Sequence, residues 1–202
     1  MLIKKNKPLK RNKGMSYVEI IVVLSIFSVL SSVVIYNYSQ FQAKVDIKSL
    51  ASDIALKVIE AQKSALSGLL PQSGIPLNWK PAYGVYFNIG SNPVTDNKSF
   101  VYFVDLDQDT FFDGSACTLE CLNKVSITAG NTISNLTVFY QNGQSASLND
   151  LTVSFTRPNS GATIKSSTNF TSDISYVEIK VLSPKLPSAT IRVYPSGRIQ
   201  VK

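Results

Sequence analysis

The feature that most constrains this chain is an apolar run near its start, "MSYVEIIVVLSIFSVLSSVVIY". From Met15 to about residue 38 the chain is rich in Ile, Val, Leu and Phe, and Ser is the main diluting residue. About 20 helical residues span a bilayer core, so we expect residues 15–38 to form a membrane helix. Glu19 is the one acidic residue in this run. An ionisable group inside a membrane span costs free energy, which indicates a function and a partner for it.

The basic character of the chain is concentrated before this run. The formal net charge is +7 and the pI is about 9.4. The first fourteen residues contain no acid and six cations, which are Lys4, Lys5, Lys7, Lys10, Arg11 and Lys13. Residues 15–202 therefore have a net charge of only +1, so the pI is a weak indication of nucleic-acid binding. By the positive-inside rule the basic segment stays in the cytoplasm and the C-terminus lies outside.

Three interpretations of this N-terminus compete. A cleaved secretory signal needs a small-x-small site after its apolar core, and "YNYSQFQAKVD" offers none. A plain membrane anchor fits the length but gives no reason for Glu19. The third interpretation uses all the features together. A basic leader ending in Gly14, a glutamate five residues later and a long apolar helix resemble the class III leader of type IV prepilins and type II secretion pseudopilins.

The resemblance implies specific processing. A prepilin peptidase would remove residues 1–14 by cutting between Gly14 and Met15, and would methylate the new amine of Met15. Glu19 would be the position-five glutamate that the family uses in assembly. The stretch "MSYVE" departs from the family's commoner start, which is Phe followed by "TLIE".

The resemblance also implies partners and a location. The partners are the prepilin peptidase, other pilin or pseudopilin subunits, an inner-membrane assembly platform, and membrane lipid before assembly. The chain would cross the inner membrane once with its head outside the cytoplasm, and would then enter a pilus or pseudopilus.

The helical pattern continues beyond the membrane, over residues 39–67. One stripe at steps of three and four consists of Ile47, Leu50, Ala51, Ile54, Val58, Ala61 and Ala65. Gly68 and Pro71 then signal the end of the helix. No proline interrupts residues 15–70, so we expect a helix without a proline kink. Its amphipathic half should pack on the rest of the chain.

We interpret residues 68–82 as a linker and residues 83–202 as a β-rich head. The predicted strands are 83–89, 99–105, 135–141, 150–156, 174–182, 189–194 and 198–202, and "FVYFV" in the second is apolar enough to be buried on both faces. The expected fold class is α+β, with a long helix packed on an antiparallel sheet or sandwich. Among pilin-like proteins this is similar to the H-type minor pseudopilin and related minor pilins.

An acidic stretch after the second predicted strand is a candidate calcium site. Asp105, Asp107, Asp109 and Asp113 have the spacing of positions 1, 3, 5 and 9 of a calcium loop. Thr110 replaces the glycine of that loop, and Ala116 replaces its bidentate glutamate. The alternative is an acidic turn stabilised by Asp side chains that accept hydrogen bonds from backbone N–H groups.

Two cysteines follow directly. Cys117 and Cys121 would lie outside the membrane, where disulfides persist. Their spacing permits a disulfide if the two Cα atoms come within about 7 Å. Such a short loop would act locally, by fixing the acidic stretch. The alternative, a two-thiol metal site, lacks a third ligand.

The end of the chain, "SATIRVYPSGRIQVK", predicts a hairpin. Ile191, Val193, Ile199 and Val201 should face inward, and Arg192, Arg198 and Lys202 should project outward. Some competence minor pilins bind DNA through basic residues in this region, so DNA is a candidate partner. The alternative is a solvated strand face that blunts an exposed edge.

We do not expect an enzyme. The chain has no histidine, which excludes Ser-His-Asp and Cys-His catalysis and every imidazole metal site.

Overall fold

The computed structural model describes residues 14–70, 79–90, 94–112, 117, 120–185 and 187–202. The chain divides into two compact units, Met1–Phe41 and Gln42–Lys202. A single helix, α1 (Tyr17–Ser67), contributes residues to both units.

The first unit consists of the apolar part of α1. None of the described residues before Ala43 is buried, and large apolar side chains such as Phe27 and Leu30 are 67% and 62% exposed. By its length and composition this helix can cross a membrane. The predicted apolar helix is therefore present, with its side chains available to lipid or to other helices.

The second unit begins with the amphipathic part of α1. The buried residues of the helix are Ala43, Ile47, Ala51, Ile54, Ala55, Val58, Ala61 and Ala65. This confirms the predicted stripe except at Leu50, which is only partly buried. After the helix, Gly68 has a φ of 69°, and the N–H groups of Gly68 and Leu69 donate back to Ala65 and Ser64. These bonds satisfy carbonyls of the last turn, as a left-handed glycine cap does.

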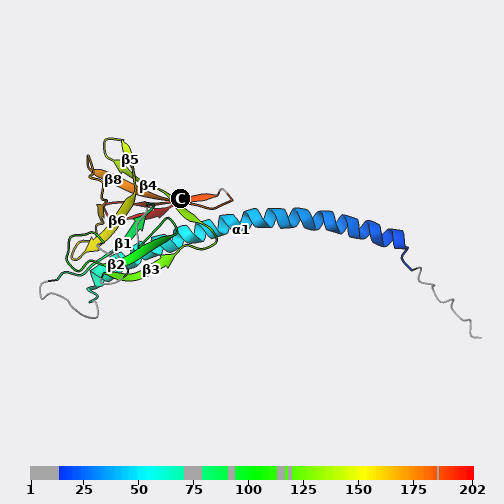
Figure 1. Cartoon of the computed structure of the whole chain (residues 1–202), viewed down its shortest axis with the longest axis horizontal. Coiled ribbons are helices and arrows are strands. Elements are labelled where there is room, and N and C mark those ends of the chain that lie inside the picture. Colours follow the sequence, from blue (N-terminus) through cyan, green and yellow to red (C-terminus); the bar gives the residue numbers. More distant parts are fainter. Residues whose placement is uncertain (1–13, 71–78, 91–93, 113–116, 118–119, 186) are drawn as a thin grey trace, which may run out of the picture. The chain divides into compact units, whose positions relative to one another are not determined.

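The described residues form ten strands in two five-stranded sheets, and every pairing is antiparallel. Figure 1 shows how the labelled strands are arranged. The first sheet has the order β3-β2-β1-β6-β7, from β1 (Ala82–Asn88), β2 (Ser99–Val104), β3 (Cys121–Ser126), β6 (Asp150–Thr156) and β7 (Thr163–Lys165). The second has the order β10-β9-β8-β4-β5, from β4 (Thr132–Tyr140), β5 (Ser145–Leu148), β8 (Ile174–Leu182), β9 (Ser188–Val193) and β10 (Ile199–Val201).

The stripe of α1 and one face of each sheet share a single core. Phe87 and Phe100 come from the first sheet, and Leu136 and Ile179 come from the second. The α+β class is confirmed, but the helix packs into a core formed by both sheets, whereas the pattern required only one. The other face of the first sheet has a smaller cluster, made of Tyr86, Val94, Val101, Phe103 and Phe112. Strand β2 is therefore buried on both faces, as predicted.

The seven predicted strands are present to within three residues, and three further strands were missed. The missed strands are β3, β5 and β7, and each lies at the edge of its sheet. Edge strands show weak apolar alternation because much of their surface faces solvent; β3, for example, is mostly exposed. For the same reason the expectation that Val201 faces inward is wrong. Val201 is 41% exposed on edge strand β10, whereas Ile191 and Val193 are fully buried on β9.

We predict that Gly84→Ala destabilises the second unit by about 1–3 kcal/mol. A Cβ at position 84 would lie 2.5 Å from the Phe103 ring and 2.9 Å from the carbonyl oxygen of Val153. The free energy of unfolding of the detergent-solubilised chain measures the effect. Gly90→Ala is the control, because its Cβ would meet only Asn88 Oδ1, at 3.4 Å. Equal stability of the two variants would contradict the prediction.

Candidate functional site

The predicted cleavage point lies just before α1. Gly14, Met15 and Ser16 have no regular secondary structure, and the helix begins at Tyr17. A Cβ at Gly14 would meet nothing within 4 Å, and Met15 is 70% exposed. The bond between Gly14 and Met15 is therefore accessible and outside the helical hydrogen-bond ladder, which a peptidase requires of its substrate.

Glu19 lies in the first turn of α1. Its Oε2 accepts a hydrogen bond from the backbone N–H of Ser16 at 3.4 Å, and the carbonyl of Ser16 accepts the N–H of Ile20. Ser16 is thus the N-cap and Glu19 the third helical residue, the arrangement of a capping box. A negative charge there also interacts favourably with the helix dipole. Glu19 therefore has a local role in addition to any role in assembly.

The acidic stretch forms a turn after β2. Carboxylate oxygens of Asp105, Asp107 and Asp109 lie within 4.8 Å of one another. Asp105 accepts the N–H groups of Gln108 at 2.7 Å and Thr110 at 3.1 Å. Asp107 accepts the N–H of Asp109, and Asp109 that of Phe111. The turn is thus stabilised by Asp side chains that accept backbone N–H groups, and the same three carboxylates are close enough together to hold a metal ion.

Asp105 is the buried member of this cluster. Burial raises the pKa of its carboxyl to about 6; the carboxylates of Glu120 and Asp107 also raise it, and the bonds from Gln108 and Thr110 oppose the shift. The carbonyl of Asp105 accepts the indole N–H of Trp79, also buried, at 2.7 Å. Asp105 therefore connects the turn to the protein core.

The turn offers carboxylate oxygens, which are the type of ligand that a hard cation prefers. Carboxylate oxygens are the ligands that calcium prefers, but calcium takes six to eight of them. The described residues supply three carboxylates, and the fourth predicted ligand, Asp113, lies outside the described residues. Each of the three already accepts a backbone hydrogen bond. The turn is therefore explained without a metal, and calcium stays a hypothesis.

Cys117 and Cys121 form a disulfide, with their Cα atoms 4.9 Å apart. Cys121 opens β3, pairs with Phe103 of β2 and packs partly against the smaller apolar cluster. The disulfide thus joins the segment after the acidic turn to the first sheet, consistent with the local role expected for it.

A row of three aromatic rings runs across the second sheet, from β4 and β8 to Tyr194, which follows β9 in the C-terminal hairpin. Phe139 stacks on Tyr176 with ring centroids 4.7 Å apart, and Tyr176 contacts Tyr194 at 5.5 Å. The guanidinium of Arg198 lies 3.8 Å from the centroid of Tyr194. Tyr194 therefore turns outward. Its direction is hard to predict from the sequence, because it lies at the end of β9, beside the turn, where strand alternation ends.

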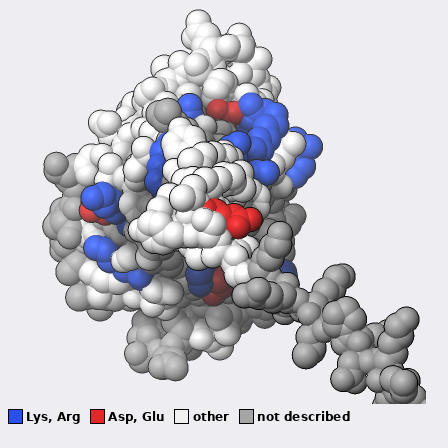
Figure 2. All heavy atoms as spheres, turned by 90° about the vertical axis from the view of Figure 1, so that its right-hand side faces the viewer, with Lys and Arg blue, Asp and Glu red and all other residues white. Residues whose placement is uncertain are grey.

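The three predicted cations of this hairpin have different surroundings. Arg192 Nε donates to Glu178 Oε1 at 2.5 Å, so that cation is paired. Arg198 and Lys202 are exposed and have no ion pair within the described part of the chain. Figure 2 shows Lys and Arg side chains in several separate groups on the displayed face, and an acidic side chain lies beside the largest group.

No protein-family model, no curated protein and no solved structure matches this chain.

We predict that the chain loses about 2–3 kcal/mol of stability between pH 4 and pH 6 through Asp105. The folded state, with a pKa of about 6, binds more protons in this range than the unfolded state, with a value near 3.8. The unfolding free energy therefore falls as pH rises. The single tryptophan, Trp79, reports unfolding next to this group in the presence of a chelator.

Asp105→Asn should flatten this pH dependence, and the exposed Asp173→Asn should leave it unchanged. A wild-type slope in Asp105→Asn would contradict the assignment. The same probe tests calcium, since an ion on the turn favours the ionised carboxylate and should raise the melting temperature at pH 7. No shift at saturating Ca²⁺ would exclude calcium at this turn.

Proposed function

We propose that this chain is a structural subunit of a type IV pilus or type II secretion pseudopilus, and a minor subunit of the H-type group. The observation that carries the proposal is the arrangement at the start of α1. An accessible glycine precedes the helix, a glutamate lies in its first turn, and none of residues 14–42 is buried. An apolar helix this exposed needs an environment outside its own chain, either lipid or neighbouring helices.

The mechanism begins in the membrane. The precursor inserts with residues 1–14 in the cytoplasm, and the prepilin peptidase cuts after Gly14 and methylates Met15. Cleavage removes the six leader cations and creates one amine two residues before the helix. The new amine is then the only positive group close in sequence to Glu19.

The carboxylate of Glu19 pairs with this amine on a neighbouring subunit as the apolar helices pack together. Two opposite charges attract strongly where water is excluded, and this attraction offsets the cost of burying each of them. An unpaired carboxylate in the bundle would be strongly unfavourable. The pairing thus selects one axial register, and the apolar side chains of residues 20–41 supply the contact area.

We predict that Glu19→Gln lowers incorporation into filaments by about tenfold, which corresponds to about 1.4 kcal/mol. Glutamine also completes a capping box, so this variant preserves the helix start and removes only the charge. The measurement is the share of mature protein recovered in the sheared filament fraction. Glu60→Gln, on the exposed face of the same helix, is the control and should assemble normally.

Intact mass of the membrane-extracted protein checks processing in each variant. Both variants and the wild type should begin at Met15 and carry one added methyl group. If Glu19→Gln assembled as well as the wild type, the negative charge of Glu19 would not be needed for assembly, and the residue would serve only as a helix cap. A full-length wild-type mass in cells with an active prepilin peptidase would contradict the proposed function itself.

A second candidate function, DNA capture, is favoured by the outward ring of Tyr194. Aromatic rings and arginines both stack on nucleic-acid bases, and cations contact phosphates. Tyr194 and Arg198 are in contact beside the turn of the C-terminal hairpin, and Lys202 lies at the other end of β10, opposite Thr190. They would make only a few contacts, so this binding would be weak and strongly dependent on salt.

If DNA binds here, Arg198→Ala/Lys202→Ala should weaken single-strand binding at least tenfold and reduce the salt slope by about 2. Fluorescence anisotropy with a labelled oligonucleotide at several salt concentrations measures both quantities. Lys48→Ala, an exposed cation on α1, is the control. Equal binding by both variants, or no binding by the wild type, would exclude this function.

A further inference from the structure

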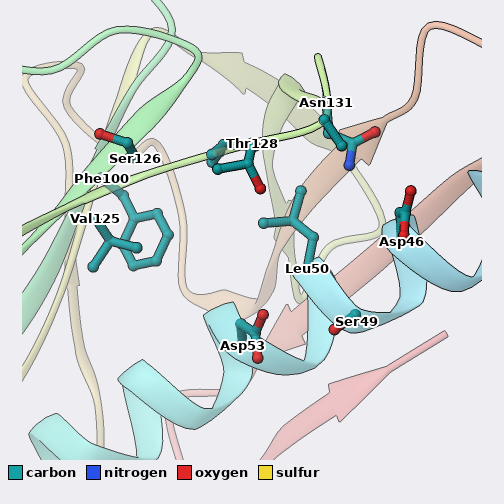
Figure 3. Close-up of a pocket in the computed structure, with 11 residues that line it drawn as sticks. Asp46, Ser49, Leu50, Asp53, Phe100, Val125, Ser126, Thr128 and Asn131 are labelled. Carbon is teal, nitrogen blue, oxygen red and sulfur yellow. The ribbon is translucent and has the colours of Figure 1, made fainter.

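A groove of about 190 Å³ lies between α1 and the segment that follows β3. Its apolar part is formed by Leu50, Phe100 and Val125. Figure 3 shows Leu50 rising from the helix between Thr128 and Asn131, with Asp46, Ser49 and Asp53 along the same helix. The groove has acidic side chains and no basic one among its lining residues.

The two carboxylates have a defined spacing. Asp46 and Asp53 are seven positions apart on α1, which places them on one face at about 10.5 Å along the axis. Asp46 accepts a hydrogen bond from Gln42 at 2.7 Å, and neither aspartate has an ion pair among the described residues. Two cations with a similar separation would therefore neutralise the groove.

Asn131 adds a buried polar side chain to the lining of the groove. This residue lines the groove, and only 3% of its surface is exposed. Its Oδ1 is buried and has no hydrogen-bond partner. A buried acceptor without a partner is unfavourable. In Figure 3 the amide nitrogen of Asn131 points toward the helix, and its oxygen points away from Leu50.

The outer face of the second sheet carries a matching pair of cations. Lys180 of β8 is in register with Thr190 of β9, and Thr190 exchanges both backbone hydrogen bonds with Lys202. Lys180 and Lys202 are thus two strands apart, or about 9.5 Å. Both are exposed, and neither has an ion pair in the part of the chain that the structure describes.

We propose that Lys180 and Lys202 of a second copy of this chain bind in this groove, opposite Asp46 and Asp53. The two spacings agree to about 1 Å, the charges are opposite, and the aliphatic part of each lysine can cover Leu50 and Phe100. This inference rests on the proposed function, because filament assembly brings a second head into contact.

The geometry of this contact suits a filament. The groove and the lysine pair are different surfaces of the same unit, so each copy can offer one surface to the copy before it and the other to the copy after it. Such a head-to-tail contact gives an open helical array unless its rotation closes a ring. The head would then contribute to the order of subunits together with the apolar helices.

Charge reversal tests the proposal in the full-length chain. Asp46→Lys/Asp53→Lys and Lys180→Glu/Lys202→Glu should each lower the filament fraction at least tenfold. The chain that carries all four changes should recover most of the wild-type yield, because the pairing is restored with opposite sign. Asp173→Lys, an exposed aspartate that does not line the groove, is the control and should assemble normally. Normal assembly of either reversed pair, or no recovery in the combined variant, would overturn the proposal.

Cross-linking gives a second measurement that does not depend on variants folding. A carbodiimide, which joins a carboxylate to a neighbouring amine, should connect Asp46 or Asp53 to Lys180 or Lys202 of another copy in wild-type filaments. Subunit cross-links that never involve these residues would overturn the groove contact while leaving the proposed function intact. Wild-type chains that are never processed or assembled would instead contradict the proposed function.

Discussion

The structure depends on the burial of one face of α1 between the two sheets. Ile47, Ile54 and Val58 are at most 2% exposed, and each such side chain contributes about 1.5–3 kcal/mol when fully buried. The alanines of the stripe let the strands approach the helix closely. Gln62 of the helix also holds two segments of the sheets in place. Its Nε2 donates to the carbonyl of Ser160 at 2.8 Å and to the carbonyl of Gly197, in the turn of the C-terminal hairpin, at 3.4 Å. The C-terminal hairpin, and the lysine at its end, thereby acquire a definite position relative to the helix face that carries the acidic groove.

Glu19 shows how one side chain can satisfy two demands. Within its own chain it caps the first turn of α1 through the N–H of Ser16. A carboxylate has about four acceptor positions, so this bond leaves capacity for an amine from another subunit. The cap also holds the carboxylate near the helix start, which reduces the entropy that a later pairing must remove. The local and the proposed intermolecular roles are therefore compatible. Capping the helix does not require a charged side chain, whereas pairing with the amine of another subunit does.

Sequence reasoning found the features that depend on near neighbours in the chain. The apolar run, the stripe from Ile47 to Ala65 and the Asp turn after β2 all have short-range periodicity or spacing. The edge strands β3, β5 and β7 escaped it, because their outer positions face solvent and show little alternation. The groove escaped it as well. In the sequence, Asp46 and Asp53 look like ordinary solvent-exposed residues of a helix. Only the tertiary structure shows that residues 125–131, far away in the sequence, lie beside them.

The sequence by itself determined the long apolar helix, its amphipathic continuation and seven of the strands that follow. These features arise from helical and strand periodicity, which can be read from each segment without knowledge of the other segments of the chain. The tertiary structure decided that the helix is buried between two sheets, that Tyr194 turns outward beneath Arg198, and that Lys180 lies two strands from Lys202. Strand order and register set these positions. They depend on contacts between residues far apart in the chain, and no local pattern encodes such distances.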